Sequence, residues 1–225
     1  TFQAFCVSTA SRVGVGNIAG IAIAVVTGGP GAVFWMWVIA TLGAATGFVE
    51  STLAQIYKAP KKTGGFVGGP AYYITQGLGK KFKPLAVVFS IAIIIALGCI
   101  GNAVQSNSIS QAMNTAFGAP LVVTGVITAV ISGLVFFGGL GRLASVAEKL
   151  VPIMAGVYLI GGSYVILEHL SEVGPAFALI FEAAFNPQAV AGGALGLTVA
   201  KAMQFGVARG LFSNEAGMGS TPHAH

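Results

Sequence analysis

The stretch SRVGVGNIAG, from Ser11 to Gly20, places an arginine, three glycines and an asparagine in the middle of an apolar segment. Glycine is a poor helix former because it has no side chain and tolerates many backbone angles. Arginine and asparagine carry polar groups that are costly to bury. The stretch is therefore either a loop exposed to water or a deliberate interruption of a helix, and the rest of the sequence decides between the two.

The composition of the 225-residue chain indicates a membrane protein. Hydrophobic residues make up 55% of the chain and charged residues 8%, with a mean hydropathy of +0.86, whereas soluble domains carry about 25% charged residues. The net charge of +5 does not indicate a nucleic-acid partner, because the basic residues lie mainly in short connections between apolar runs. Cys6 and Cys99 lie in apolar runs and are expected to pack as small hydrophobic residues.

Six apolar runs are candidates for transmembrane helices, which need about 20 mostly apolar residues. The expected spans are residues 2–26, 32–56, 85–112, 120–139 and 150–168, and a sixth that starts near 191 and is interrupted around 205–210. Glycine- and proline-rich turns such as TGGPGA separate them. Between the fifth and sixth spans we expect an external loop with a short amphipathic or re-entrant helix. The expected fold class is an all-α polytopic membrane protein.

The basic residues predict an orientation in the membrane. Six lysines lie between the second and third spans, namely Lys58, Lys61, Lys62, Lys80, Lys81 and Lys83. Arg142 and Lys149 lie in the next connection on the same side, and positive residues mark the cytoplasmic face. The Lys-rich loop 58–83 is therefore expected in the cytoplasm, in a multi-pass protein of the plasma (inner) membrane. Within this loop, GGPAYYITQGL is expected to form a short helix along the lipid interface.

The opening stretch has three physical interpretations. Gly14, Gly16 and Gly20 form G-x-G-x-x-x-G, one residue too long for a dinucleotide fingerprint and without its βαβ context. Gly16 and Gly20 could instead form a small-residue face against which another helix packs. The third interpretation is a discontinuous helix, whose unpaired amides and carbonyls line a ligand site. We favour the third interpretation and keep the second open.

A discontinuous first span can bind both an anion and a cation. The N-terminus of its outer half would attract a carboxylate, and exposed carbonyls near Val13 and Gly14 would hold Na⁺. Asn17 can offer a side-chain oxygen to the cation or an amide to the carboxylate. The sequence therefore predicts a site near the middle of the membrane.

A second glycine-rich interruption appears in KAMQFGVARGLFSNEAGMGS, residues 201–220. Two interrupted spans in corresponding positions of two halves indicate a transporter built from inverted repeats. We expect five-plus-five spans, with the first repeat in residues 1–190 and the start of the second in 191–225, as part of a longer chain. Phe205 and Phe212 beside the second interruption would leave space only for a small substrate.

Polar side chains of the third span need partners at membrane depth. Asn102 and Gln105 are three residues apart and share a helix face. Gln105 is expected to face the cavity, whereas Asn107 suits either the cavity or a hydrogen bond between helices.

Charged residues within or beside the apolar runs are expected to pair with one another. Glu50 is predicted to be the structural partner of a basic group such as Lys58 rather than a proton relay. Arg12 and Arg209 could pair with Glu215 across the two interruptions, as a gate or simply as compensated buried charge. Spacings typical of catalytic acid–base pairs, nucleophiles or metal clusters are absent from the sequence, so we do not expect an enzyme.

Five motifs follow one another along almost the whole chain: GNIAG (16–20), GGPGAVFWMWVIATLG (28–43), GGPAYYI (68–74), GNAVQSNS (101–108) and RGLFSNEAGMGS (209–220). Together they resemble the alanine/glycine:cation symporter family, also called the sodium:alanine symporter family. The Phe-Trp-Met-Trp run after the Gly-Pro turn is the most specific of them. Trp35 and Trp37 would suit a membrane interface just past the external turn.

The resemblance implies secondary active transport of a small neutral amino acid, usually alanine or glycine, with Na⁺ as the coupling ion. It also implies the inverted-repeat, leucine-transporter-like fold of the amino acid–polyamine–organocation superfamily, in which broken helices one and six hold the substrate. By motif, Na⁺ would bind near Val13, Gly14 and Asn17. The residues implied to contact the substrate are Gly14, Gly16, Asn17, Gln105, Phe205 and Gly206.

Other functions stay open at this point. A transporter of the same fold could couple to H⁺ or carry a different amino acid. A channel or a membrane-packing subunit would have no substrate site at all.

Family members often have threonine where this sequence has Val15, which places in doubt any polar contact at that position.

Overall fold

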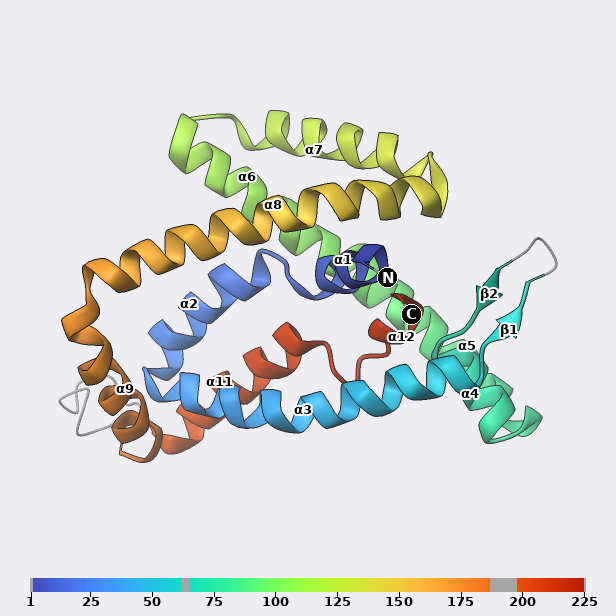
Figure 1. Cartoon of the computed structure of the whole chain (residues 1–225), viewed down its shortest axis with the longest axis horizontal. Helices are drawn as coiled ribbons and strands as arrows, with labels where there is room; N and C mark the ends of the chain where they lie inside the picture. Colours follow the sequence, from blue (N-terminus) through green and yellow to red (C-terminus); the bar gives the residue numbers. More distant parts are fainter. Residues whose placement is uncertain (1, 62–64, 187–197, 225) are drawn as a thin grey trace. The chain divides into compact units, whose positions relative to one another are not determined.

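The computed structural model describes residues 2–61, 65–186 and 198–224, and in these ranges the chain is almost entirely helical (Figure 1). The exception is a two-stranded antiparallel hairpin of β1 (Ala59–Pro60) and β2 (Phe66–Val67). Many large apolar side chains are exposed along the helices, as expected for surfaces that face lipid. The prediction of an all-α polytopic membrane protein is confirmed.

The first apolar run is two helices, α1 (Phe2–Arg12) and α2 (Gly16–Gly28), with non-helical backbone between them. A turn at Gly29, with φ of 78°, leads directly into α3 (Gly31–Ile56). Residues Phe2–Gly28 and Gly31–Ile56 are long and apolar enough to cross a membrane. Both predicted spans and the predicted interruption of the first one are therefore confirmed.

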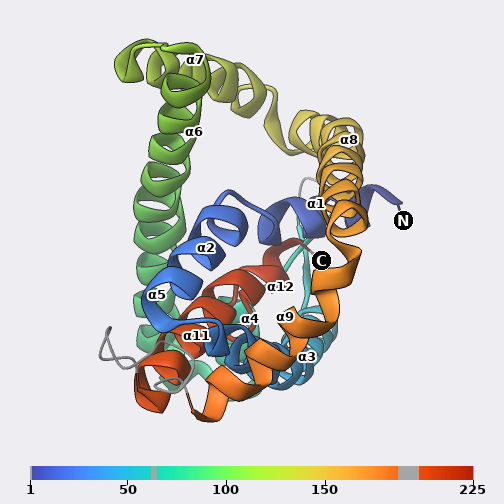
Figure 2. The same ribbon diagram turned by 90° about the vertical axis from the view of Figure 1, so that its left-hand side faces the viewer.

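The Lys-rich connection contains α4 (Pro70–Gly77), which confirms the short helix predicted there, and a 3₁₀ turn η1 (Lys80–Phe82). The predicted third span follows as α5 (Lys83–Ile93), a π-helical segment η2 (Ile94–Gly101) and α6 (Asn102–Phe117). Figure 2 shows α5 and α6 aligned as one long rod. The Asn102 side-chain amide donates to the Gly98 carbonyl at 3.0 Å, so a polar side chain satisfies a backbone carbonyl within the wider π-helical turn.

The next two predicted spans are α7 (Leu121–Phe136) and α8 (Gly139–Glu168). Gly118 ends α6 in the left-handed conformation, with φ of 68°, and Gly139 turns the chain between α7 and α8 with φ of 74°. Residues 141–168 of α8 are long and apolar enough to span, whereas α7 is a shorter apolar helix of 16 residues. The helix expected in the external loop is α9 (Leu170–Phe185).

The sixth span differs from its prediction. Its expected start near residue 191 lies outside the described residues. The helix α11 (Val199–Asn214) continues through 205–210, where we predicted the interruption, and the backbone leaves the helix only at Glu215–Ser220, before the short α12 (Thr221–Ala224). Gly206 and Gly210 therefore do not break the helix.

The chain divides into two compact units. Unit 1 consists of Thr1–Gly16, Ala45–Glu148 and Glu215–His225, and unit 2 consists of Asn17–Ala44 and Lys149–Asn214. The boundaries fall between Gly16 and Asn17 and between Asn214 and Glu215, so each interrupted span contributes one part to each unit. This division differs from the predicted repeats 1–190 and 191–225, which it does not test.

The packing of α11 against α3 within unit 2 explains why the chain stays helical at Gly206 and Gly210. A Cβ on Gly206 would overlap the Ala32 carbonyl oxygen, and one on Gly210 would overlap the Ile39 side chain. Both glycines, four residues apart, therefore form a small-residue face on which α3 packs closely against α11. The prediction of a break at these glycines was wrong because glycine serves close helix packing as well as helix interruption.

Aromatic residues hold α9 against α3 within unit 2. Phe177, Phe181 and Phe185 recur every four residues on α9 and so lie on one face of the helix. Phe181 and Phe185 contact Phe34 with ring centroids 5.6 and 5.2 Å apart, and Phe177 contacts Trp37 at 5.8 Å. The specific Phe-Trp-Met-Trp motif thus has a packing partner in the chain.

Gly206→Ala tests the packing of α11 on α3. The new methyl group would overlap the Ala32 carbonyl and lie 2.7 Å from Cβ of Trp35, and overpacking of this kind costs about 1–3 kcal/mol. We expect a lower thermal midpoint for the full-length protein in detergent. Gly161→Ala in α8, where nothing lies within 4 Å of a built Cβ, should leave the midpoint unchanged or raise it. An unchanged midpoint for Gly206→Ala would refute the close contact.

Candidate functional site

The interruption of the first span leaves backbone carbonyls at the end of α1 and backbone amides at the start of α2. Val13 still donates its amide to the Thr9 carbonyl at 2.8 Å, and α2 does not begin until Gly16. The last carbonyls of a helix and the first amides of the next have no partner within those helices. The end of α1 and the start of α2 therefore present the carbonyls and amides that a cation and a carboxylate can use.

Unit 1 brings two of the predicted site residues together. A Cβ added to Gly14 would lie 3.4 Å from the side-chain nitrogen of Gln105. Gln105 belongs to α6, is exposed, and follows the π-helical segment by one helical turn. The amide of Gln105 thus lies beside the non-helical backbone of the first span, and its facing a cavity stays a prediction. Val13, Gly14 and Gly16 belong to the same unit.

The second interruption, Glu215–Ser220, is tightly shaped. Gly217 and Gly219 have φ of 86° and 74°, and Glu215, with φ of 51°, is the one non-glycine residue with positive φ in the described part of the chain. Such a conformation is uncommon for a residue with a Cβ and needs compensation. The Ser220 hydroxyl donates to the Glu215 carboxylate at 2.6 Å and closes the segment on itself.

Arg12 links the end of α1 to α12 within unit 1. Its Nε and Nη2 atoms lie 3.3 and 3.2 Å from the hydroxyl oxygen of Thr221, which accepts from both and is fully buried. Arg12 also interacts electrostatically with Glu215. The pairing of Arg12 with Glu215 stays a prediction, and Thr221 is a partner that the prediction did not contain.

Arg209 has its own surroundings within unit 2. Its guanidinium lies 5.4 Å from the centre of the Phe212 ring and occupies the space that a Cβ on Gly20 would need. Gly20 thus permits a close approach, as the packing interpretation of the opening stretch expected. The group that approaches Gly20 is the Arg209 side chain rather than a face of small residues on another helix.

Glu50 has a different partner from the predicted one. Its carboxylate accepts the backbone amide of Gly217 at 3.1 Å, and the side chain is buried. Lys58 instead donates to the Gln55 side chain at 2.8 Å and lies over the Phe66 ring. The basic partner expected for Glu50 was wrong because an unwound segment supplies amides that compete for a buried carboxylate.

The remaining predicted residues lie in unit 2. Phe205 is half-buried and packs on a small core of Ala24, Ala32 and Met36. Gly206 packs against Ala32, as described above. These contacts give Phe205 and Gly206 a role in holding α11 to α2 and α3, and their contact with substrate stays a prediction. Asn17, at the start of α2, is half-buried and also stays a predicted ligand.

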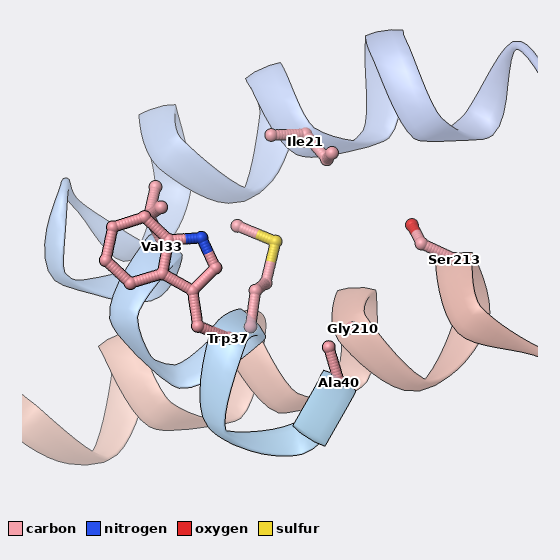
Figure 3. Close-up of a pocket in the computed structure, with 7 residues that line it drawn as sticks. Ile21, Val33, Trp37, Ala40, Gly210 and Ser213 are labelled. Atoms are coloured by element: carbon pink, nitrogen blue, oxygen red, sulfur yellow. The ribbon is translucent and has the colours of Figure 1, made fainter. Parts of the chain in front are cut away.

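Unit 2 contains a pocket of about 310 Å³ among α2, α3 and α11. Its lining is mostly apolar and comprises Ile21, Val33, Met36, Trp37, Ala40, Gly210 and Ser213. Figure 3 shows the Ser213 hydroxyl directed from α11 toward this pocket. In the described part of the chain, this hydroxyl is the one buried side-chain oxygen or nitrogen without a hydrogen-bond partner.

Sequence reasoning did not single out Ser213. A buried hydroxyl without a partner costs free energy, so its position beside a pocket indicates a place for a polar group of a ligand. Ser213 lies in the last turn of α11, directly before the true interruption. A prediction of the interruption at Glu215–Ser220 would have made Ser213, two residues before it, a candidate site residue.

Thr221→Val tests the link between α1 and α12. The change removes the acceptor of the Arg12 guanidinium, and a hydrogen bond to a charged group contributes about 1.5–3 kcal/mol. We expect a lower thermal midpoint of the full-length protein in detergent. Thr221→Ser keeps the hydroxyl and gives up one buried methyl group, worth about 0.8 kcal/mol, so it should lose less. A serine variant as unstable as the valine variant would contradict the link.

Comparisons with known proteins are consistent with these features. All 225 residues match the model of the sodium:alanine symporter family. The chain is 49% identical to the probable sodium/glutamine symporter GlnT of Bacillus subtilis, over 99% of this chain and 45% of that protein. It is 48% identical to the putative sodium/proton-dependent alanine carrier protein YrbD of the same organism, over 99% of this chain and 45% of YrbD.

A third relative comes from an archaeon. The chain is 40% identical to the sodium/alanine symporter AgcS of Methanococcus maripaludis, over 99% of this chain and 49% of AgcS. The chain thus spans about half the length of the curated relatives it matches. Since the family model covers the whole sequence, this chain belongs to the sodium:alanine symporter family.

Proposed function

We propose that the protein is a secondary active transporter that carries a small neutral amino acid, alanine or glycine, together with Na⁺ by alternating access. The observation that carries the proposal is the interruption of the first span, where unwound backbone lies beside the Gln105 amide. Membership in the sodium:alanine symporter family supports it. Relatives named as transporters also favour transport over catalysis.

The interruption has the chemistry for both solutes. Carbonyls at the end of α1, near Val13 and Gly14, are hard oxygen ligands of the kind that suit Na⁺, and Asn17 would add a side-chain oxygen. The first backbone amides of α2, from Gly16 onward, would receive the carboxylate of the amino acid, because the N-terminus of a helix attracts negative charge. Gln105 would hydrogen-bond the substrate from α6.

The pocket of unit 2 would accept a small apolar group. Its lining offers little polarity beyond the Ser213 hydroxyl, so it suits an apolar group better than a charged one. An alanine methyl group or a similarly short side chain fits such a lining. Phe205 and Gly206, on α11 of the same unit, stay proposed substrate contacts.

Two alternatives remain within the same fold. The relative GlnT is named a glutamine symporter, so a longer polar side chain is the alternative substrate. The relative YrbD is named for sodium or proton dependence, so H⁺ is the alternative coupling ion. Neither alternative changes the residues proposed to bind the amino acid backbone.

The membrane arrangement is part of the proposal. We infer a five-plus-five inverted repeat, with residues 1–190 as the first repeat and 191–225 as the start of the second, in the leucine-transporter-like fold. The Lys-rich loop 58–83 would face the cytoplasm at the inner membrane. In its described part, Lys58 and Lys81 lie over the rings of Phe66 and Phe82, a pairing that suits a lipid interface.

Uptake into proteoliposomes tests substrate and ion together. We expect the full-length protein to accumulate labelled alanine when an inward Na⁺ gradient is imposed, and glycine to compete. Replacing Na⁺ with choline should abolish accumulation, and Asn17→Ala should weaken its Na⁺ dependence because one proposed ligand is lost. Accumulation driven by a pH gradient without Na⁺ would replace Na⁺ with H⁺, and stronger competition by glutamine than by glycine would replace the substrate.

Ser213→Ala separates ligand binding from folding. The hydroxyl has no hydrogen-bond partner among the described residues, so its removal should leave the thermal midpoint unchanged or raise it. If the hydroxyl serves the amino acid, the KM for uptake should rise about fivefold, the equivalent of about 1 kcal/mol for one neutral hydrogen bond. Ser163→Ala, an exposed serine of α8, is the matched control and should change neither quantity. An unchanged KM for Ser213→Ala would exclude Ser213 from the site.

A further inference from the structure

The unwound segment Glu215–Ser220 is seated on a specific surface of unit 1. Gly219 lies so close to α4 and α5 that a Cβ there would be 2.5 Å from the Phe89 ring and 2.7 Å from the Pro70 ring. Gly69, directly before α4, has φ of 101°, and a Cβ on it would be 2.9 Å from Nε2 of His223. Glycines on both sides therefore permit a close approach between the segment and the start of α4.

His223 closes the other end of the same segment. Its Nδ1 atom lies 2.8 Å from the Gly219 carbonyl oxygen. Because a carbonyl only accepts, Nδ1 carries the proton and donates it. The segment is thus held at Gly219 by side-chain packing and by a hydrogen bond from within α12.

Glu50 provides the polar attachment of this segment from α3. Only 8% of the residue is exposed, and one carboxylate oxygen accepts the Gly217 amide at 3.1 Å. Burial and, to a smaller extent, the negative charge of Glu50 raise the pKa of the Tyr73 hydroxyl on α4. Glu50 is therefore bonded to the interruption of the sixth span and interacts electrostatically with α4.

We propose that Glu50 is a positioning residue for transport: by accepting the Gly217 amide, it holds the segment Glu215–Ser220 in the conformation that receives substrate. The inference rests on the proposed transport function. In this conformation Gly217 adopts a positive φ and presents its amide to Glu50 of α3. A charged acceptor is suited to this task because hydrogen bonds to ionised groups are about twice as strong as neutral ones.

The role of Glu50 is to accept a hydrogen bond, and this distinguishes it from a proton relay or a cation ligand. A glutamine at position 50 keeps an acceptor oxygen at nearly the same place and removes the charge. An alanine removes both. The two variants therefore separate hydrogen bonding from charge, and Gln55→Ala, an exposed change on the same helix, is a matched control.

Hydrogen–deuterium exchange of the full-length protein gives a readout that does not need transport. In Glu50→Ala we expect the amides of residues 215–220 to exchange about tenfold faster, the factor expected from one lost hydrogen bond to a charged acceptor. In Glu50→Gln the exchange rate of these amides should stay within about threefold of the wild-type rate. In Gln55→Ala the exchange rate should equal the wild-type rate. Unchanged exchange in Glu50→Ala would overturn the proposal, even if the protein transports as proposed.

Alanine uptake by the same variants tests positioning against simple support of the fold. A loss of folded protein alone would lower the maximal rate and leave KM unchanged, whereas a mispositioned segment raises KM. We expect a KM several-fold higher in Glu50→Ala and close to wild type in Glu50→Gln. An unchanged KM in Glu50→Ala, or a Glu50→Gln variant as impaired as Glu50→Ala, would overturn the positioning role. If wild type shows no uptake, the proposed function fails, and exchange still reports on the hydrogen bond.

Discussion

Backbone that leaves a helix inside a membrane protein must find new hydrogen-bond partners, and this constraint shapes the described part of the chain. Within unit 1, Glu50 satisfies an amide of the second interruption, and Ser220 closes that segment on Glu215. Arg12 ties the end of α1 to the buried hydroxyl of Thr221. Only 8% of the residues are charged. Two of them, Arg12 and Glu50, bond to groups at or beside helix ends.

Glycine has two opposite uses in the same molecule. At Gly217 and Gly219 it permits backbone angles that other residues rarely adopt, and the helix stops. At Gly206 and Gly210 it permits the close approach of α3, and the helix continues. Helix interruption and close helix packing both use glycine in this chain, and 33 of its 225 residues are glycine.

The accuracy of the sequence predictions follows from this ambiguity. The interruption of the first span was predicted correctly, because Gly14 and Gly16 lie two residues apart in a segment that also carries polar groups. The interruption of the sixth span was placed about ten residues too early, since four glycines offered several break points. Glu50 was recognised as a buried charge that needs a partner, but its partner is a backbone amide, and any residue could supply that amide.

The sequence by itself determined the membrane-spanning helical class, most of the spans, the family and the proximity of polar residues to the first interruption, because apolar run lengths and motifs are local properties. Only the tertiary structure decided that Gln105 lies beside Gly14, that Ser213 has no hydrogen-bond partner in the described part of the chain, and that Glu50 accepts the Gly217 amide. These contacts join residues far apart in the chain or depend on what surrounds a side chain. Neither composition nor periodicity specifies such surroundings, since they arise when helices pack.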